Sequence, residues 1–139
     1  MKRNWKERTI SATLESEFLS SPEAVWRVLT TDETGETPVS ADPETFAHAE
    51  EVFDSMLFRM EEKTELERYR FTLKNGYLTG DYDCRLSPLE GGGTRVTFSD
   101  SLRFHHLAAF LIAAIGMPIK KSQKIRVEGL KKRLGENGQ

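Results

Sequence analysis

The chain has 139 residues, 37% of them hydrophobic and 30% charged, which is typical of an ordinary globular protein. This length fits one domain, and a net charge of −2 gives no reason to expect a nucleic-acid partner. A single cysteine, Cys84, excludes an internal disulfide and suits a reducing compartment. The longest apolar run, residues 107–115, is shorter than the ~20 residues of a membrane span. With no signal peptide evident, we expect a cytoplasmic protein with one domain over residues 1–139.

The N-terminal third predicts one strand and one short helix. Residues 1–8 are basic and show no hydrophobic periodicity, so we expect a loose, solvated lead-in. Residues 9–18 alternate between apolar and polar side chains, which indicates a half-buried strand. Ser20 and Glu23 have the spacing of a capping box. They predict a helix that ends near Thr30.

The segment after this helix has two interpretations. Residues 31–45 are polar and rich in turn-forming residues, so they predict an irregular connection. Beyond them, apolar residues fall at helical spacing, and residues 42–44 are suited to begin a helix. Alternatively, residues 46–50 form a strand, residues 51–55 a turn and residues 56–63 a second strand. We favour two strands, because the second runs directly into clearer strands.

Residues 68–104 read as a meander of three antiparallel strands, each apolar on one face. Asn75 and Gly76 mark the first turn, since this dipeptide readily adopts the positive φ of tight hairpins. Residues 87–93 form the longer second turn. The register is well specified, because a slip of one residue would expose every aromatic side chain. Asp100 stands out as an acid on the apolar face of the last strand.

The C-terminal part predicts two helices. Residues 105–115 are apolar all round, which is typical of a buried or partner-covered helix. Residues 116–118 then break this helix. The last helix, from about Pro118 to Leu134, carries an apolar stripe interrupted by one glutamine, formed by Ile119, Gln123, Val127, Leu130 and Leu134. Its other faces are basic and carry Lys120, Lys121, Lys124, Arg126, Lys131, Lys132 and Arg133.

Three stretches resemble one known superfamily. "ISATLESEFLSSPEAVWRVLTT" is similar to its opening strand and helix start, "YLTGDYDCRLSPLEGGGTRVTFSDSLRF" to its hairpin and final strand, and "KIRVEGLKKRLGE" to its C-terminal helix. The superfamily is the SRPBCC or START-like group, which includes polyketide cyclases, lipid-transfer domains and pathogenesis-related plant allergens. The likeness covers nearly the whole chain, except residues 31–45.

The resemblance implies an α+β helix-grip fold, in which a curved antiparallel sheet wraps around a long C-terminal helix and leaves an apolar cavity between them. The superfamily motifs quoted above are structural and do not identify an activity. On this chain the implied ligand-binding residues are Trp26, Met56, Phe58, Met60, Tyr69, Phe71, Tyr82, Phe98, Asp100, Phe104, Gln123 and Val127.

Asp100 is the candidate catalytic residue. Buried without a partner, it would have a raised pKa and could act as a general acid or base. The alternatives are a pair with an arginine or a position where the strand bulges toward water. Tyr69 and Tyr82 either present hydroxyls to a ligand or fill the core. Gln123 suits a hydrogen bond to a ligand equally well as one between two elements.

The sequence indicates neither a metal site nor a cofactor. His105 and His106 are adjacent, so they cannot easily share one metal ion from a helix face, and His48 is distant in sequence. We therefore expect a domain that binds, transports or senses a small hydrophobic molecule. The alternatives are an enzyme of the polyketide cyclase or dehydratase kind and a protein-interaction module like the chaperone-activating relatives. The basic last helix leaves peripheral membrane contact open, and the sequence does not distinguish a monomer from a homodimer.

Overall fold

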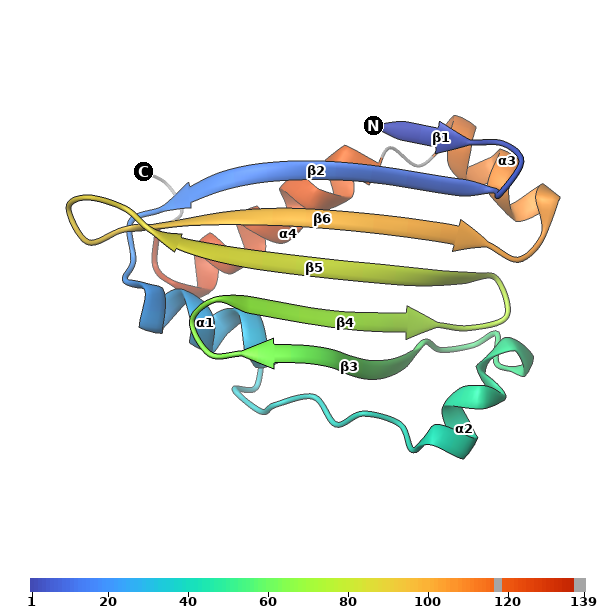
Figure 1. The fold of residues 1–139 in the computed structure, drawn as a ribbon, viewed down its shortest axis with the longest axis horizontal. Coiled ribbons are helices and arrows are strands. Elements are labelled where there is room, and N and C mark those ends of the chain that lie inside the picture. Colours follow the sequence, from blue (N-terminus) through green and yellow to red (C-terminus); the bar gives the residue numbers. More distant parts are fainter. Residues whose placement is uncertain (117–118, 137–139) are drawn as a thin grey trace.

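One antiparallel sheet of six strands carries the other elements. The structure is a computed structural model that describes residues 1–116 and 119–136 (Figure 1). The strands follow the order β1-β2-β6-β5-β4-β3 across the sheet. The elements are β1 (Lys2–Asn4), β2 (Thr9–Phe18), α1 (Pro22–Thr30), α2 (Pro43–Ala47), η1 (Ala49–Glu51), β3 (Leu57–Thr64), β4 (Arg68–Lys74), β5 (Leu78–Pro88), β6 (Thr94–Phe104), α3 (Leu107–Gly116) and α4 (Ile119–Arg133).

Helices α1, α3 and α4 lie on one face of this sheet, which we call the inner face (Figure 1). Directly paired residues of antiparallel strands share a face. The register places Met60 opposite Phe71, Phe71 opposite Tyr82, Tyr82 opposite Asp100 and Asp100 opposite Ala12. This row crosses five strands on the inner face. The predicted α+β helix-grip fold is therefore confirmed, with its sheet against the long C-terminal helix.

Two clusters of buried apolar side chains hold the helices against the sheet. The larger joins α1, α4 and the sheet and consists of Phe18, Val25, Trp26, Tyr69, Cys84, Leu86, Val96, Phe98, Val127 and Leu130. The smaller joins α3, the start of α4 and the sheet and consists of Ile10, Ala12, Phe104, Phe110, Ala113 and Ile119. Each large side chain buried in this way contributes about 1.5–3 kcal/mol to folding. The alternation of the meander strands thus identified their core faces correctly.

The start of α1 differs by one residue from the predicted capping box. Ser21 is the N-cap, and its hydroxyl accepts a hydrogen bond from the backbone N–H of Ala24 at 3.3 Å. Ser20 instead donates its hydroxyl to the carboxylate of Glu136 at 2.5 Å. The predicted helix is confirmed, ending at Thr30.

The expectation of a loose lead-in over residues 1–8 is wrong for its first part. Lys2–Asn4 forms β1, which pairs with Thr9–Ser11 of β2 at the edge of the sheet. Its three side chains are exposed, so no hydrophobic alternation marks the strand in the sequence. Backbone pairing with the edge of β2 supplies the order that side-chain burial does not.

The preferred strand over residues 46–50 is also wrong. The chain forms α2 at Pro43–Ala47, followed by the short 3-10 helix η1. Asp42 caps α2, since its carboxylate accepts the backbone N–H of Thr45 at 2.8 Å. The alternative helix start at residues 42–44 was the correct interpretation, because the cap and the following proline outweigh the nearby strand pattern. The second predicted strand is present as β3.

The first turn of the meander is present, but its glycine is explained by a close contact and not by a positive φ. Gly76 does not adopt positive φ in the structure. The ring of Phe53 lies so close to its Cα that a side chain there would overlap the ring. Asn75 stabilises the turn by accepting the backbone N–H of Tyr77 at 2.9 Å. The predicted helix break at residues 116–118 reaches residues outside those that the structure describes.

Candidate functional site

A cavity of about 470 Å³ lies between the inner face of the sheet and helices α3 and α4. Strands β2, β4, β5 and β6, the residue before β3 and both helices contribute to its wall, which is mostly apolar. Small-molecule pockets commonly have this size and character. The lining residues are Ile10, Met56, Phe71, Leu73, Leu78, Tyr82, Asp100, Leu102, Phe104, Ala113, Ile119, Ser122 and Arg126.

Gly80 gives Tyr82 room beside this cavity. A Cβ atom at Gly80 would lie 2.8 Å from Cε2 of Tyr82 and 3.0 Å from Cδ2 of Leu102. The tyrosine ring therefore occupies the space that the side chain of any residue other than glycine at position 80 would take. It also stacks on Phe71, with ring centroids 5.0 Å apart and planes 13° apart. The glycine and the aromatic pair together shape this part of the wall.

Asp100 and Arg126 form the polar part of the cavity wall. Asp100 is only 5% exposed, and its Oδ1 accepts a hydrogen bond from Nη2 of Arg126 at 3.0 Å. Burial raises the pKa of Asp100, and the nearby guanidinium offsets only part of that effect. The guanidinium also lies 4.8 Å from the ring centroid of Phe98 and 5.5 Å from that of Tyr82. The arginine is thus held by one charge and two aromatic faces.

Two buried polar atoms near this pair have no hydrogen-bond partner among residues 1–116 and 119–136. They are Nε of Arg126 and Oε1 of Gln123. Gln123 donates its amide Nε2 to the backbone oxygen of Ala12 at 2.9 Å, which links α4 to β2. An unpaired buried donor or acceptor is costly, and it is commonly satisfied by water or a ligand. Of the two residues, Arg126 lines the cavity and Gln123 does not, so the donor of Arg126 is the atom available to a further polar group beside Asp100.

Tyr82 and Cys84 follow each other on the inner face of β5 and are both held neutral. Burial raises the pKa of the Tyr82 hydroxyl, and the carboxylate of Asp100 adds to this effect. Burial also raises the pKa of the Cys84 thiol to about 12. The cysteine is therefore a small buried hydrophobic residue, which agrees with its place in the larger core cluster.

Five of the twelve predicted ligand-binding residues line the cavity, namely Met56, Phe71, Tyr82, Asp100 and Phe104. Four others, Trp26, Tyr69, Phe98 and Val127, lie in the larger core cluster, and Phe58 packs against it. Met60 is 42% exposed, although it lies in the row of Phe71 and Tyr82. Gln123 is buried and bonds to the sheet backbone, as described above. The cavity therefore borders α3 in addition to the sheet and the C-terminal helix that the resemblance implied.

Arg126 is the candidate site residue that the sequence did not identify. It was assigned to the solvated basic faces of the last helix, but its side chain points toward the sheet and is 28% exposed. It lies three residues after Gln123 and next to Val127, both of which face the sheet. A lone acid on an apolar strand face was the available signal, because such an acid requires a basic partner. Of the alternatives for Asp100, the arginine pair is the one observed.

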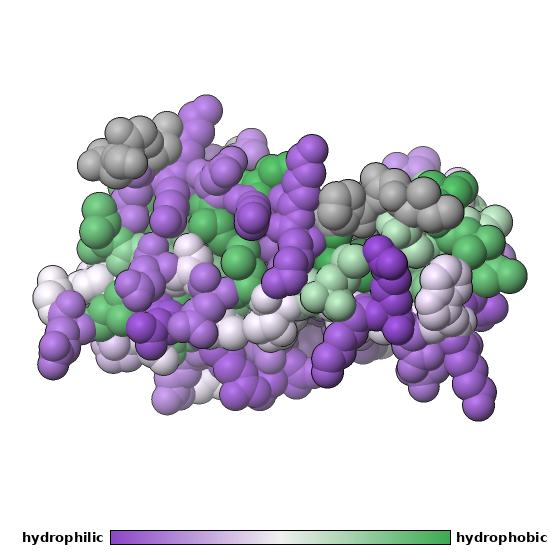
Figure 2. Space-filling view, turned by 90° about the horizontal axis from the view of Figure 1, so that it is seen from above, coloured by the Kyte–Doolittle hydropathy of each residue, from purple (hydrophilic) through white to green (hydrophobic). Residues whose placement is uncertain are grey.

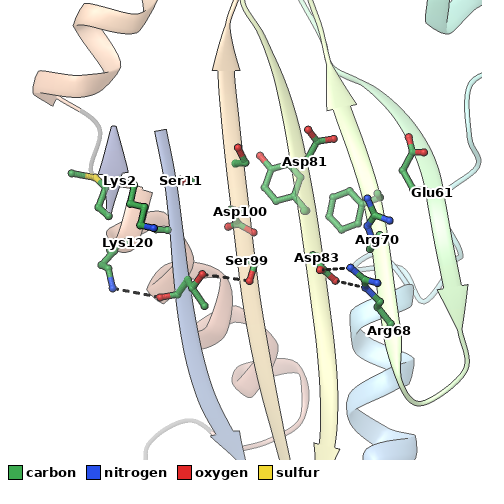
Figure 3. Close-up of a pocket in the computed structure, with 16 residues that line it drawn as sticks. Lys2, Ser11, Glu61, Arg68, Arg70, Asp81, Asp83, Ser99, Asp100 and Lys120 are labelled. Carbon is green, nitrogen blue, oxygen red and sulfur yellow. Dashed lines mark hydrogen bonds and ion pairs between the residues drawn. The ribbon is translucent and has the colours of Figure 1, made fainter. Parts of the chain in front are cut away.

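The opposite, outer face of the sheet is polar. A second hollow of about 530 Å³ lies over it, as Figure 3 shows. Arg68 donates two hydrogen bonds to Asp83 there, at 3.0 and 2.8 Å. The hydroxyls of Thr13 and Ser99 lie 3.4 Å apart. These groups satisfy one another, so this hollow has the chemistry of a solvated ion-paired surface.

Among residues 1–116 and 119–136, no metal-binding cluster adds to the candidate site. Within the described ranges, no group of three His, Cys, Asp or Glu side chains could hold a metal ion. His105 lies between the turn and the start of β5, with Nδ1 3.2 Å from the backbone oxygen of Gly76 and Nε2 2.8 Å from Oγ1 of Thr79. It therefore fixes the end of β6 to the β4–β5 turn. No helix in the described part of the chain is long and apolar enough to cross a membrane.

Solved structures share this arrangement at low sequence identity. Protein MLL2253 from Mesorhizobium loti matches with a TM-score of 0.63 and 15% identity over 94% of this chain and 100% of its own. A norcoclaurine synthase point mutant from Thalictrum flavum, in complex with a transition-state analogue, matches with a TM-score of 0.60 and 10% identity over 94% and 97%. Ara h 8.0201 matches with a TM-score of 0.54 and 14% identity over 89% and 93%.

The chain has the helix-grip fold. The implied START-like architecture is confirmed by these matches, which concern the fold alone. No family model matches the chain, and no curated protein matches it in sequence. What the helix-grip cavity of this chain holds must therefore be argued from its own residues.

Proposed function

We propose that this protein binds a small, largely hydrophobic molecule with one polar group in the cavity between the sheet and α4. The observation that carries the proposal is an apolar wall that contains a buried ion pair. Leu73, Leu78 and Leu102 provide apolar contacts for a ligand. The ion pair of Asp100 and Arg126 provides charged groups at one position of the wall. Pockets for small molecules typically combine many apolar contacts with a few polar groups that fix orientation.

The unsatisfied atoms indicate the chemistry of the polar group. Nε of Arg126 is a donor and Oε1 of Gln123 is an acceptor. A hydroxyl group on a ligand can accept from Nε of Arg126, whose side chain lines the cavity, whereas a carboxylate would meet repulsion from Asp100. We therefore favour an apolar molecule that carries a hydroxyl or similar neutral polar group. Its body would contact the leucines and the Phe71–Tyr82 stack.

Thermal unfolding in the presence of apolar alcohols, phenols and sterols tests this proposal. A ligand that binds only the folded state raises the melting temperature, by mass action. Ser122→Trp places an indole at the rim of the cavity and should abolish the rise. Lys121→Trp is the matched control, because the neighbouring side chain does not line the cavity. No rise with any of these compounds, or equal rises in both variants, would contradict the proposal.

A second candidate is an enzyme of the polyketide cyclase or dehydratase kind. It is favoured by the raised pKa of Asp100 in the wall of the cavity, beside Tyr82. One structural neighbour is itself an enzyme captured with a transition-state analogue. In this case Asp100 would transfer a proton, so Asp100→Asn should abolish turnover while ligand binding persists. Binding and turnover that are both unchanged in Asp100→Asn would contradict catalysis by this residue.

The cell compartment is proposed from the cysteine, and the partner from the cavity. One buried free cysteine suits a reducing compartment, and we propose a cytoplasmic protein whose main partner is the small molecule.

A further inference from the structure

Helix α3 exposes large apolar side chains on the side that is turned away from the sheet. Its inward residues Phe110 and Ala113 are buried against the sheet and the start of α4. On the other side Leu107 is 54%, Leu111 37% and Ile112 69% exposed. Leu107 and Leu111 are four residues apart and therefore neighbours on the helix surface, and Ile112 lies further round on the side turned away from Phe110 and Ala113. The exposed side of α3 is therefore as apolar as its buried side.

Trp5 extends this apolar surface. It lies in the turn between β1 and β2, is 57% exposed, and contacts Phe110 edge-on with ring centroids 5.0 Å apart. Tryptophan is enriched at membrane interfaces, since its ring is apolar and its N–H is polar. Figure 2 shows hydrophobic residues gathered at the end of the molecule that α3 occupies, with strongly hydrophilic residues beside them. We call Trp5, Leu107, Leu111 and Ile112 the α3 patch.

The segments around the α3 patch are strongly basic. Residues 1–8 and 103–124 contain eight lysines and arginines against one glutamate, whereas the rest of the chain contains twelve against twenty-one acids. Lys2 and Lys120 line the same hollow, so the N-terminal strand and the start of α4 lie together in space. A protein with a net charge of −2 thus has an excess of positive charge in the two segments that contain the α3 patch.

We propose that this end of the molecule docks on the surface of an anionic lipid bilayer. The α3 patch would enter the interface between headgroups and acyl chains, and the surrounding lysines would meet the negative surface. Stable peripheral binding commonly needs two such signals together, and both are present here. A second copy of the chain is a poorer occupant, because two such faces would bring like charges together. The proposal goes beyond ligand binding and does not depend on what the cavity holds.

Co-flotation of the full chain with vesicles tests the proposal directly. We expect binding to vesicles of phosphatidylcholine and phosphatidylglycerol at 7:3 in low salt. Binding should be weak to phosphatidylcholine alone and weaker in about 0.5 M salt, which screens charges beyond a few ångströms. The fluorescence of Trp5 should shift to the blue on binding, since the other tryptophan, Trp26, is already buried.

The apolar contribution is tested by Leu111→Gln with Ile112→Gln. The pair should lower vesicle affinity by about tenfold or more, because two aliphatic side chains no longer enter the interface. Ile125→Gln is the matched control: Ile125 is 59% exposed on α4, outside the α3 patch, and its change should leave affinity unaltered. Equal losses of vesicle affinity in both variants would show non-specific hydrophobic adsorption and overturn the proposal.

The charge contribution is tested by Lys6→Glu with Lys121→Glu. Each basic residue near an anionic surface strengthens binding by about fivefold, so the double reversal should lower affinity by at least that factor per residue. Lys132→Glu, at the C-terminal end of α4, is the control and should have little effect. Sedimentation in the absence of vesicles is measured in parallel. No binding to the anionic vesicles, or dimers that dissociate in Leu111→Gln with Ile112→Gln, would overturn the proposal.

Discussion

Arg126 donates a hydrogen bond from Nη2 to Oδ1 of Asp100 at 3.0 Å, and this pair joins α4 to β6 in the wall of the cavity. The carboxylate is buried, whereas the guanidinium is reached by solvent on one side. A buried acid without its cation is strongly destabilising. The pair therefore both holds the helix on the sheet and supplies the charge that a ligand would meet.

Arg126→Met leaves Asp100 buried without a positive partner. We expect the free energy of unfolding to fall by about 2 kcal/mol near pH 8, less than for a fully buried pair because Arg126 is partly exposed. Urea unfolding measures the change. Adding Asp100→Asn should restore most of the loss, because a neutral amide needs no cation. A double variant as unstable as the single variant would show that lost packing of Arg126 is the cause.

Asp100 should make stability fall as pH rises. Its pKa is raised in the folded protein by burial, so the folded state keeps this proton at pH values where the unfolded chain has lost it. The contribution is complete below the unfolded pKa, near pH 4, and is lost as pH rises through the folded pKa. We expect the difference in unfolding free energy between the natural protein and Asp100→Asn to decline over this range. A flat difference would contradict a raised pKa.

Glu136 should have the opposite pH dependence. Burial tends to raise its pKa, but hydrogen bonds from Ser20 and from the backbone of Leu19 outweigh burial and lower it. Its contribution is therefore present above the unfolded pKa and is lost as pH falls through the folded pKa. Glu136→Gln should lower stability by about 1 kcal/mol at pH 7 and by less near pH 3. Glu128→Gln, on the same terminal region, is an exposed control that should change little.

Gly80→Ala tests whether Tyr82 needs the space beside the cavity. The new Cβ would lie 2.8 Å from the tyrosine ring, so we expect a loss of about 1–3 kcal/mol. Gly129→Ala is the control on α4, where nothing lies within 4 Å, and it should stabilise the helix by about 1 kcal/mol. Thermal unfolding compares the two. Tyr82→Leu added to Gly80→Ala should recover part of the loss, since it removes the ring.

The sheet was predictable because its information is local. Alternation along β4, β5 and β6 identified the buried face of each strand, and Asp100 was recognised as the exception on that face. Segments without such a signal were predicted less well. β1 has three exposed residues and is ordered by pairing with β2, and α2 depends on one cap at Asp42 within a polar connection.

The candidate site was predictable only in part. The inner face was known residue by residue, but the sequence could not tell which inward residues contact α4 and which border open space. Trp26 and Tyr69 pack against each other edge-on in the core, whereas Phe71 and Tyr82 stack beside the cavity. That distinction depends on where α3 and α4 cross the sheet, and a strand pattern carries no information on this.

The sequence by itself determined the strands of the meander, their inward faces and the single acid among them, because side-chain alternation follows directly from strand geometry. Tertiary structure decided the partner of that acid. Arg126 lies on a helix whose basic residues all look solvated in sequence, and only the packing of α4 on β2, beside β6, turns it toward Asp100. Pairing between distant elements is a property of their crossing, so it is absent from the pattern of either element alone.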